Sequence, residues 1–479
     1  MGILDWFKTQ AMSEKQFTER EISKFKSSRR RQDMFCGSRY FAGDQDILRR
    51  KREVIGEDGK PQAVENLPNN RLVNNQYRKL VQQKTDYIVS KPLTLETENK
   101  AYQELLADVF GPDMHKKLRK LGEGAYNEGI AWLHPYWEAD GSLAFKVFEG
   151  HEILPFWKDS EHTELDYAVR IYAVEAYEGY NEVIIEKAEI YTLEGVERYV
   201  LQNNSLVPDV EMGERAPYVV FQDAEGEKAF NWARIPLIAF KANDQEQPLI
   251  QRVKGLQDSL NEIISDFKNN MQEDARNTIL VLQNYDGTNL GEFRRNLAQY
   301  GAVKVRTVDG AAGGISTLQV QVNAGNYESL TNLLKKAIIE NGCGYDVSDL
   351  KNGNTPNEMT IKSIYNDIDL DANALEVEFQ FALRQLLWFV NAYFAASGKG
   401  SFDNEQVDII FNRDTVVMES TVIEDCQKSV GILSKESIIA NHPWTKDVAQ
   451  EVEKLDKEQQ AQQEQYNQTF NNSDTGAQQ

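Results

Sequence analysis

The chain of 479 residues contains only three cysteines and five histidines, and it has no long hydrophobic run. Cys36, Cys343 and Cys426 are far apart and have neither CxxC nor metal-ligand spacing, so we expect reduced thiols rather than a disulfide framework. The longest apolar stretch, LLWFVNAYFAA from Leu386, is too short to span a bilayer. The opening MGILDWFKTQ lacks the basic start and apolar core of a secretory signal. We therefore expect a soluble intracellular protein.

Motifs that carry catalysis are also missing. The sequence has no GxxxxGK[ST] phosphate loop and no GxSxG nucleophile elbow. Its histidines are dispersed, so the sequence predicts neither a metal cluster nor a nucleophile–base pair. The stretch GEGAYNEG from Gly122 departs from GxGxxG spacing and indicates a helix with tolerated glycines. We predict that the protein is not an enzyme and has no catalytic residues, cofactor or metal.

An acidic run, Asp367, Asp369 and Asp371, is the strongest remaining candidate for a metal site. Residues two apart on a helix point in different directions, so this spacing favours a solvated acidic surface over a cation site. A metal-dependent nuclease that uses these acids is kept as an alternative.

Acidic residues outnumber basic ones, which gives a formal net charge of −22. Such a charge argues against a general nucleic-acid coat, although it leaves room for DNA as a transient client. Two basic clusters stand out, SSRRR at 27–31 and RRKR at 49–52. We interpret them as solvated faces of N-terminal helices, with an electrostatic patch for a protein or DNA partner as the alternative.

At 479 residues the chain is too long for one ordinary core, so we expect several substructures. The hydrophobic pattern contains both helical and strand-like stretches and predicts an α+β protein. Residues 67–96 read as an amphipathic helix that stops before Lys91-Pro92 and feeds a strand. Short alternating runs between Tyr126 and Pro236 indicate an antiparallel sheet region, which RIPLIAFKAND (Arg234 to Asp244) closes.

Two long helices follow, with a compact insert between them. The first begins near Pro248 and carries an apolar seam at gaps of three and four residues, namely Val253, Leu256, Leu260, Ile263, Ile264, Phe267 and Met271. The insert ends near Asn323, and the second helix has its own apolar row to Ile338. A polar Gly/Asn/Pro loop, DVSDLKNGNTPNEMT from Asp346, comes straight after it.

A very long helix is predicted from Glu358 to Ala396, acidic in its first half and apolar in its second. The strand QVDIIFN and several short helices follow, with an N-cap predicted at Ser434. From about Gln459 the tail is Gln/Asn-rich, and we expect it to be disordered.

Three stretches in this order resemble the portal proteins of tailed double-stranded-DNA bacteriophages, particularly those of long-tailed phages of Gram-positive hosts. They are NNRLVNNQYRKLVQQKTDYIVSKP, RIPLIAFKAND and LIQRVKGLQDSLNEIISDFKNNMQEDARNTILVLQNYDG. In the second stretch, the family has a pair of asparagines where this chain has Ala242 and Asn243. Ala242 is therefore a departure from the family's pattern, and Asn243 agrees with it.

The resemblance implies a portal-type subunit. Copies of it, usually twelve, would assemble into a ring with a central channel. Carried over by segment, the expected parts are a β-rich wing, a helical stem, a clip and a helical crown. Their residues are 1–247 (wing), 248–277 (first stem helix), 278–322 (clip), 323–345 (second stem helix), 346–357 (tunnel loop), 358–414 (wing), 415–459 (crown) and 460–479 (tail).

The resemblance also implies the site residues. The loop at 346–357 would project into the channel, where its side chains would contact passing DNA without trapping it. These side chains belong to Lys351, Asn352, Gly353, Asn354, Thr355 and Asn357. Four basic residues of the clip are expected to contact protein partners, namely Arg294, Arg295, Lys304 and Arg306.

The implied partners are other copies of the chain, double-stranded DNA, the terminase large subunit, the head–tail connector, and the major capsid and scaffolding proteins, without a membrane. The implied location is the portal vertex of the virion, after assembly in the host cytoplasm. A cytosolic helical scaffold with no role in DNA passage remains the second alternative.

Overall fold

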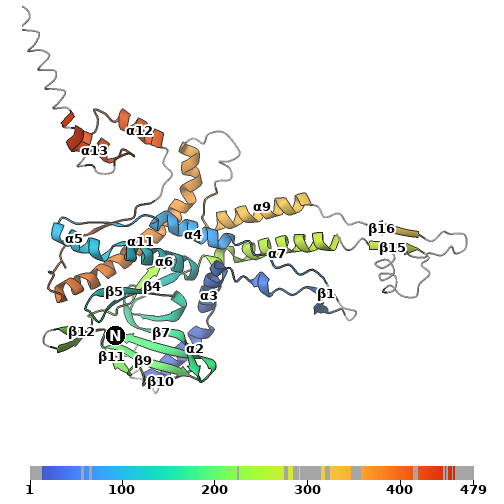
Figure 1. Cartoon of the computed structure of the whole chain (residues 1–479), viewed down its shortest axis with the longest axis horizontal. Helices are drawn as coiled ribbons and strands as arrows, with labels where there is room; N and C mark the ends of the chain where they lie inside the picture. The colour runs from blue at the N-terminus through green and yellow to red at the C-terminus, as the bar shows by residue number, and fades with distance from the viewer. Residues whose placement is uncertain are drawn as a thin grey trace, which may run out of the picture. The chain divides into compact units, whose positions relative to one another are not determined.

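The computed structural model describes residues 13–55, 59–63, 67–223, 226–274, 279–283, 291, 314–318, 324–346, 358–413, 419–445, 448, 451–455 and 457–458. The chain forms two compact units, the first of Met1–Lys351 with Ile364–Arg413 and the second of Asn352–Ser363 with Asp414–Gln479. Helices and strands are both abundant (Figure 1), so the α+β prediction is confirmed at the level of fold class.

The N-terminal region is helical, as predicted, in α2 (Glu14–Ser27) and α3 (Arg29–Ala42). A capping box starts α2, because the Ser13 hydroxyl accepts from the Gln16 backbone while the Gln16 side chain accepts from the Ser13 backbone. Helix α3 ends at Gly43, whose φ of 97° suits glycine. A short 3₁₀ turn η1 (Asp46–Arg49) and the antiparallel pair β1 (Glu53–Ile55) and β2 (Pro61–Ala63) follow.

The predicted antiparallel sheet region is confirmed, but its first strand begins at Ile130 rather than at Tyr126. One sheet has the order β10-β9-β8-β7-β6 with β11 on β9, and a second has the order β14-β4-β5. The strands are β4 (Ile130–Trp137), β5 (Leu143–Phe148), β6 (Ile153–Trp157), β7 (Leu165–Glu178), β8 (Asn181–Thr192), β9 (Gly195–Gln202), β10 (Ser205–Pro208), β11 (Arg215–Ala216), β12 (Val219–Asp223), β13 (Gly226–Phe230) and β14 (Ile238–Lys241), with the turn η2 (Gly150–Glu152).

Tyr126 lies in a helix rather than at the start of the sheet region. Helix α6 (Pro112–Glu128) contains most of GEGAYNEG, which confirms the interpretation of that stretch as a helix with glycines. The helix ends at Gly129, with φ of 82°, where a Cβ atom would lie 2.1 Å from the Glu246 carbonyl oxygen. That close approach requires glycine.

The N-terminal helices cover the larger sheet. Ile22 and Phe25 of α2 are buried against Tyr167 and Val169 of β7. Met34 of α3 belongs to a second buried cluster that includes Trp132 and Phe148. Burial of a large apolar side chain stabilises the fold by about 2 kcal/mol, so these helices are part of the core of the first unit.

Helix α4 (Gln76–Val89) confirms the amphipathic helix predicted within residues 67–96. Strand β3 (Thr94–Glu96) follows Lys91-Pro92, as predicted, and helix α5 (Lys100–Val109) comes next. The residues just before α4 run extended alongside α7 (Ile250–Asp274), the helix predicted from Pro248.

Four polar side chains of α7 hold this extended segment. Gln257, Asn261, Ser265 and Asn269 are buried and accept hydrogen bonds of 2.8–3.0 Å from four backbone N–H groups. The donors belong to Tyr77, Asn74, Leu72 and Asn70, in that order. We call these four acceptors the polar ladder.

The spacing of the polar ladder has a geometric reason. Four helical residues rise about 6 Å, and two extended residues rise about 6.6 Å. Side chains four apart on α7 therefore match backbone N–H groups two apart in residues 70–74, and the helix acts as a substitute neighbouring strand. The predicted apolar seam is correct at Val253 and Leu260, which are fully buried, and wrong at Met271, which is 56% exposed.

The second predicted long helix is α9 (Ala324–Asn341), which packs alongside α7 (Figure 1). Phe267 of α7 contacts Tyr327 of α9 with ring centroids 4.8 Å apart. In the insert between these helices, β15 (Ile279–Gln283) pairs antiparallel with β16 (Gly314–Leu318).

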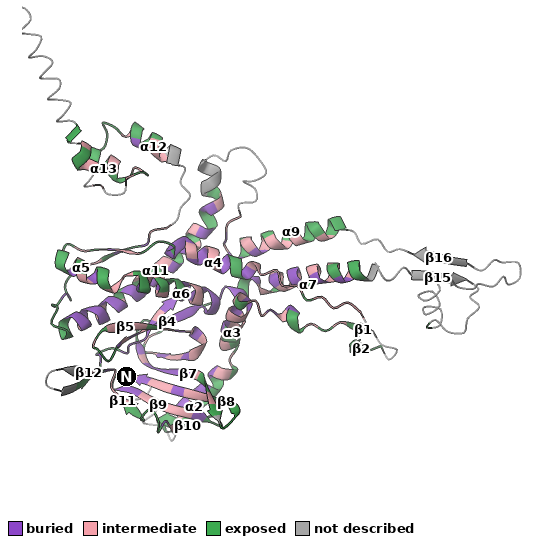
Figure 2. Ribbon diagram, in the orientation of Figure 1, coloured by how far each residue is buried: buried purple, intermediate pink, exposed green. Residues whose placement is uncertain are grey.

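The predicted helix from Glu358 to Ala396 is confirmed as α11 (Glu358–Ala396), and its apolar second half is largely buried (Figure 2). The following strand is β17 (Asp408–Ile410), which pairs with β3. In the second unit, α12 (Glu419–Lys428) precedes α13 (Lys435–Ala440), whose predicted cap is confirmed because the Ser434 hydroxyl accepts from the Ser437 backbone. Among the described helices, none is long and apolar enough to cross a membrane.

The polar ladder leads to a stability prediction. Asn261→Ala should lower the free energy of unfolding by about 3 kcal/mol, because the partly buried Asn74 N–H and the buried Gln45 and Gln257 side chains lose their shared partner. Urea unfolding of the purified chain measures this. Glu262→Ala, at the exposed next position of the same helix, is the control, and equal stability of the two variants would contradict the account.

Candidate functional site: the base of the 346–357 loop

The predicted site residues lie outside the described part of the chain. This applies both to the loop set (Lys351, Asn352, Gly353, Asn354, Thr355 and Asn357) and to the basic set (Arg294, Arg295, Lys304 and Arg306). Their positions therefore stay predictions. What the structure describes is how the chain is held just before the loop, at the end of α9, and how the following helix α11 is held from Tyr365 onward.

A buried ammonium group connects the end of α9 with α11. Lys84 of α4 has a fully buried side chain, and its Nζ forms an ion pair of 2.7 Å with Asp371 of α11. The same nitrogen donates hydrogen bonds to the carbonyls of Gly342 (2.8 Å) and Cys343 (3.4 Å), just beyond α9. Each of the three ammonium protons thus has an acceptor. Burial lowers the pKa of Lys84, and the charge of Asp371 opposes that shift.

Asp371 collects contacts from two further helices. The Tyr126 hydroxyl of α6 donates to it at 3.1 Å, and Arg252 of α7 lies 3.5 Å away. Burial, together with the neighbouring carboxylate charge, raises the pKa of Tyr126 well above its ordinary value, so this hydroxyl remains a donor. One carboxylate therefore connects α4, α6, α7 and α11.

The turn after α9 fits closely against α4. A Cβ atom at Gly342 or Gly344 would lie 2.1 or 2.5 Å from a terminal methyl group of Leu80, so a larger residue at either position would require Leu80 to move. Cys343 between them has a φ of 51°, the left-handed conformation that often ends a helix. The turn is thus shaped by its contact with α4.

Beyond the turn, α4 continues to hold the chain up to the loop. The Gln83 amide donates to the Tyr345 carbonyl at 2.8 Å, and its oxygen accepts from the Tyr345 N–H at 3.2 Å. The Tyr345 ring lies 4.5 Å from the ring of Tyr365 on α11. The Tyr87 hydroxyl donates to Asp369. One face of α4, made by Leu80, Gln83, Lys84 and Tyr87, therefore holds the chain just before the loop and the part of α11 that begins at Tyr365.

The acidic run is only partly the solvated surface that we predicted. Asp371 is 16% exposed and paired, and Asp369, which is 43% exposed, accepts from Tyr87 and lies 3.6 Å from Arg413. Asp367 is exposed, as predicted. Two of the three carboxylates thus have cationic partners within the fold. Among the described residues, no group of three or more Asp, Glu, His or Cys is arranged to hold a metal ion.

The two basic clusters were predicted to be solvated helix faces, but some of their residues form ion pairs within the fold. Arg30 pairs with the buried Glu246, and Arg50 pairs with Asp266 of α7 at 3.0 Å, so neither is a purely solvated residue. Arg29, by contrast, is 87% exposed, as expected for a solvated face. The clusters therefore attach the N-terminal region to the rest of the first unit.

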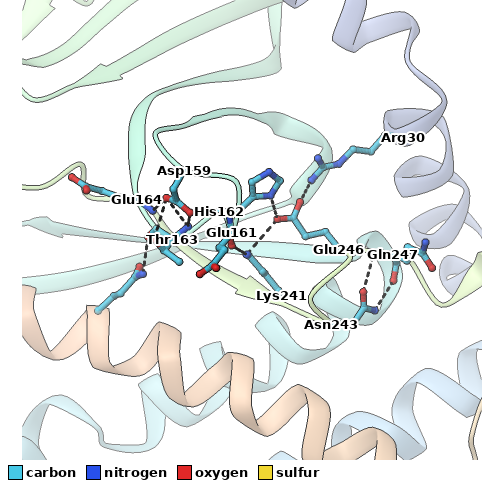
Figure 3. A network of polar contacts seen from close by, with 11 residues as sticks. Arg30, Asp159, Glu161, His162, Thr163, Glu164, Lys241, Asn243, Glu246 and Gln247 are labelled. Carbon is cyan, nitrogen blue, oxygen red and sulfur yellow. Dashed lines mark hydrogen bonds and ion pairs between the residues drawn. The ribbon is translucent and has the colours of Figure 1, made fainter. Parts of the chain in front are cut away.

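Glu246 lies at the centre of a second network, which includes residues of RIPLIAFKAND (Figure 3). Asn243 closes the turn that presents it by accepting from the Gln247 N–H at 3.0 Å. Arg30 on α3, His162 Nδ1 at 2.6 Å and Lys241 at 3.5 Å surround the carboxylate. Burial raises the pKa of Glu246, but Arg30, then His162 and Lys241, outweigh it and hold that pKa below 4.5.

Sequence reasoning missed Lys84, although a signal was present. Lys84 is four residues from both Leu80 and Ile88, on the row of α4 that is otherwise apolar. A lysine in such a row indicates a buried ion pair, but the sequence does not say which carboxylate it meets.

Lys84 gives the first prediction for this site. Lys84→Met should lower the free energy of unfolding by about 4 kcal/mol, because it leaves Asp371 buried without its closest cation. Lys79→Met, at an exposed position of the same helix, is the control. Adding Asp371→Leu to Lys84→Met should recover part of the loss. A Lys84→Met protein as stable as the control in urea would contradict the role of the pair.

Glu246 gives a pH prediction. Because its folded pKa is depressed, its contribution is present above about pH 4.5 and is lost as the pH falls through the folded value. Glu246→Gln should lower stability by about 2 kcal/mol at neutral pH and flatten the loss below pH 4.5. Thermal unfolding from pH 7 to pH 3 measures both effects, and parallel curves for the two proteins would contradict the assignment.

Known proteins have sequences similar to most of this chain. Residues 22–465 match the family described as "Phage portal protein, SPP1 Gp6-like". The portal protein of Bacillus phage SPP1 is 27% identical over 425 residues, which cover 88% of this chain and 82% of the relative. The portal protein of Clostridium phage phiCD119 is 28% identical over 442 residues, which cover 89% and 92%. The match includes both long helices, the loop and its anchored base, and the chain belongs to the SPP1 Gp6-like family of phage portal proteins.

Proposed function

We propose that this portal protein assembles into a ring, with about twelve copies as in the family, around a channel for double-stranded DNA. The family match over residues 22–465 is the observation that carries the proposal. In this proposal the ring occupies one vertex of the capsid, a terminase motor drives DNA through it during packaging, and the genome leaves through it later. The ring is assembled in the host cytoplasm with capsid and scaffolding proteins.

In the proposed ring, α7 and α9 form the stem, β15 and β16 belong to the clip, and α12 and α13 belong to the crown. The β-rich part together with most of α11 forms the wing. Arg294, Arg295, Lys304 and Arg306 of the clip contact the terminase or the head–tail connector. Alanine substitutions at these four positions that leave binding of both partners intact would remove this assignment.

The loop at 346–357 projects into the channel and contacts DNA. Its anchored base supports this role, because passing DNA pulls on the loop and the attachment must resist that pull. Lys84 and Gln83 tie the chain just before the loop to α4, and Lys84 also pairs with Asp371 of α11, the helix that follows the loop, so we propose that strain on the loop is passed into the helical core. The loop itself offers uncharged hydrogen-bonding groups and one lysine per subunit, which suits contact without tight binding.

Negative-stain electron microscopy of the purified chain, with native mass spectrometry, tests the ring. Rings of about twelve subunits with an open axial hole are expected. A compact closed dimer would contradict the proposal and favour the scaffold alternative. The nuclease alternative would use the acidic run, but two of its carboxylates are paired within the fold, Asp369 with Arg413 and Asp371 with Lys84.

The loop gives a prediction of its own. Lys351→Glu should impair DNA packaging or retention in assembled particles while leaving rings intact, because it reverses the one positive charge of each loop. Lys351→Gln, which removes the charge without reversing it, should have a smaller effect. Packaged DNA per particle measures both variants, and unchanged packaging by Lys351→Glu would exclude an electrostatic role for this residue.

A further inference from the structure

Helix α11 carries an exposed row of side chains in addition to its buried face. The row follows gaps of three and four residues, the spacing of one helix face in contact with another helix. Its apolar members Leu370, Val377 and Phe381 are 63%, 66% and 42% exposed. Asp367, Ala374 and Arg384 complete the row and are also exposed. We call these six residues the α11 stripe.

The stripe is not a consequence of a loosely packed helix. On the opposite face, Leu375, Phe379 and Leu386 are at most 1% exposed. A surface helix normally has one apolar side and one polar side. Since α11 is apolar on two sides and only one of them is buried within the first unit, the stripe is a candidate contact surface.

The C-terminal end of the stripe opens into a hollow. Phe381 and Arg384 line a cavity of about 520 Å³ together with Trp157, Leu237 and Arg234. The Arg234 guanidinium stacks on Trp388 of α11, 4.7 Å from the ring centroid. The cavity gives a partner's side chains a place to insert next to the exposed apolar row.

A second uncovered row lies on α9 of the same chain. Leu330 and Leu333 are 42% and 63% exposed, and Lys336 in the next turn is 62% exposed. A ring of identical subunits needs two different surfaces that fit each other, because each subunit contacts its two neighbours through opposite sides. Both rows carry charges of either sign at their ends, since the α11 stripe runs from Asp367 to Arg384 and Lys336 on α9 lies 3.9 Å from Glu340.

We infer that the α11 stripe of one subunit packs against the Leu330–Leu333 row on α9 of a second copy of this chain. This inference rests on the proposed ring and assigns one of its subunit contacts. Burial of the two rows removes apolar side chains from water on both sides, and Asp367 of one subunit next to Lys336 of the other would help to orient the two helices.

Matched lysine substitutions test the contact in the full-length chain. Leu370→Lys/Val377→Lys changes the stripe, and Leu333→Lys changes the α9 row. Lysine is a good helix former, and all three positions are exposed, so the subunit fold should survive. Ile184→Lys on β8 is the control, because Ile184 is an exposed apolar residue of similar exposure, 71%, away from both rows. Circular dichroism checks the fold of each variant.

Both the stripe variant and the α9 variant should reduce the fraction of chain in rings by about tenfold at equal concentration, as measured by native mass spectrometry and negative-stain microscopy, and the control should assemble normally. Normal rings from either row variant would overturn the inference. The stripe variant is also co-expressed with the capsid and scaffolding proteins. If it forms normal rings that are not incorporated into capsid shells, the inference is overturned and the stripe is assigned to a contact with another protein. A wild-type chain that forms no rings would instead overturn the proposed function itself.

Discussion

The arrangement of helices in the first unit depends on one buried positive charge. The Lys84 ammonium has no access to water, so it must find its partners inside the fold. It finds them at the end of α9 and on α11, the two helices on either side of the 346–357 loop. Any movement of one helix relative to the other would break an ion pair or leave a donor unpaired. The loop therefore starts and ends on elements that are fixed to each other.

The polar ladder extends this principle to the neighbouring helix. A helix and an extended segment cannot share backbone hydrogen bonds, yet the ladder gives the segment before α4 a regular set of acceptors. Buried amides are costly unless they are satisfied, so the ladder fixes the register of α7 against α4. Because α4 also holds the loop, α7 and the loop base belong to one connected structure.

Much of this fold could be predicted from the sequence, and the failures have physical reasons. The bounds of α11 follow from local periodicity, and so do the strands of the β-rich region. The polar ladder was missed because a search for apolar seams passes over Gln257, Asn261, Ser265 and Asn269, although their regular spacing of four is visible in the sequence. The partners of Lys84 and Arg30 could not be predicted, since they lie hundreds of residues away and only tertiary contacts bring them together.

The central claim is that the loop at 346–357 lies against DNA in an assembled portal. The most direct measurement places a photoreactive amino acid at position 354 and irradiates DNA-filled particles, with position 184 on the β-rich part as the control. The account predicts cross-links to DNA from position 354 and none from position 184. Filled particles in which position 354 cross-links only to protein would contradict it.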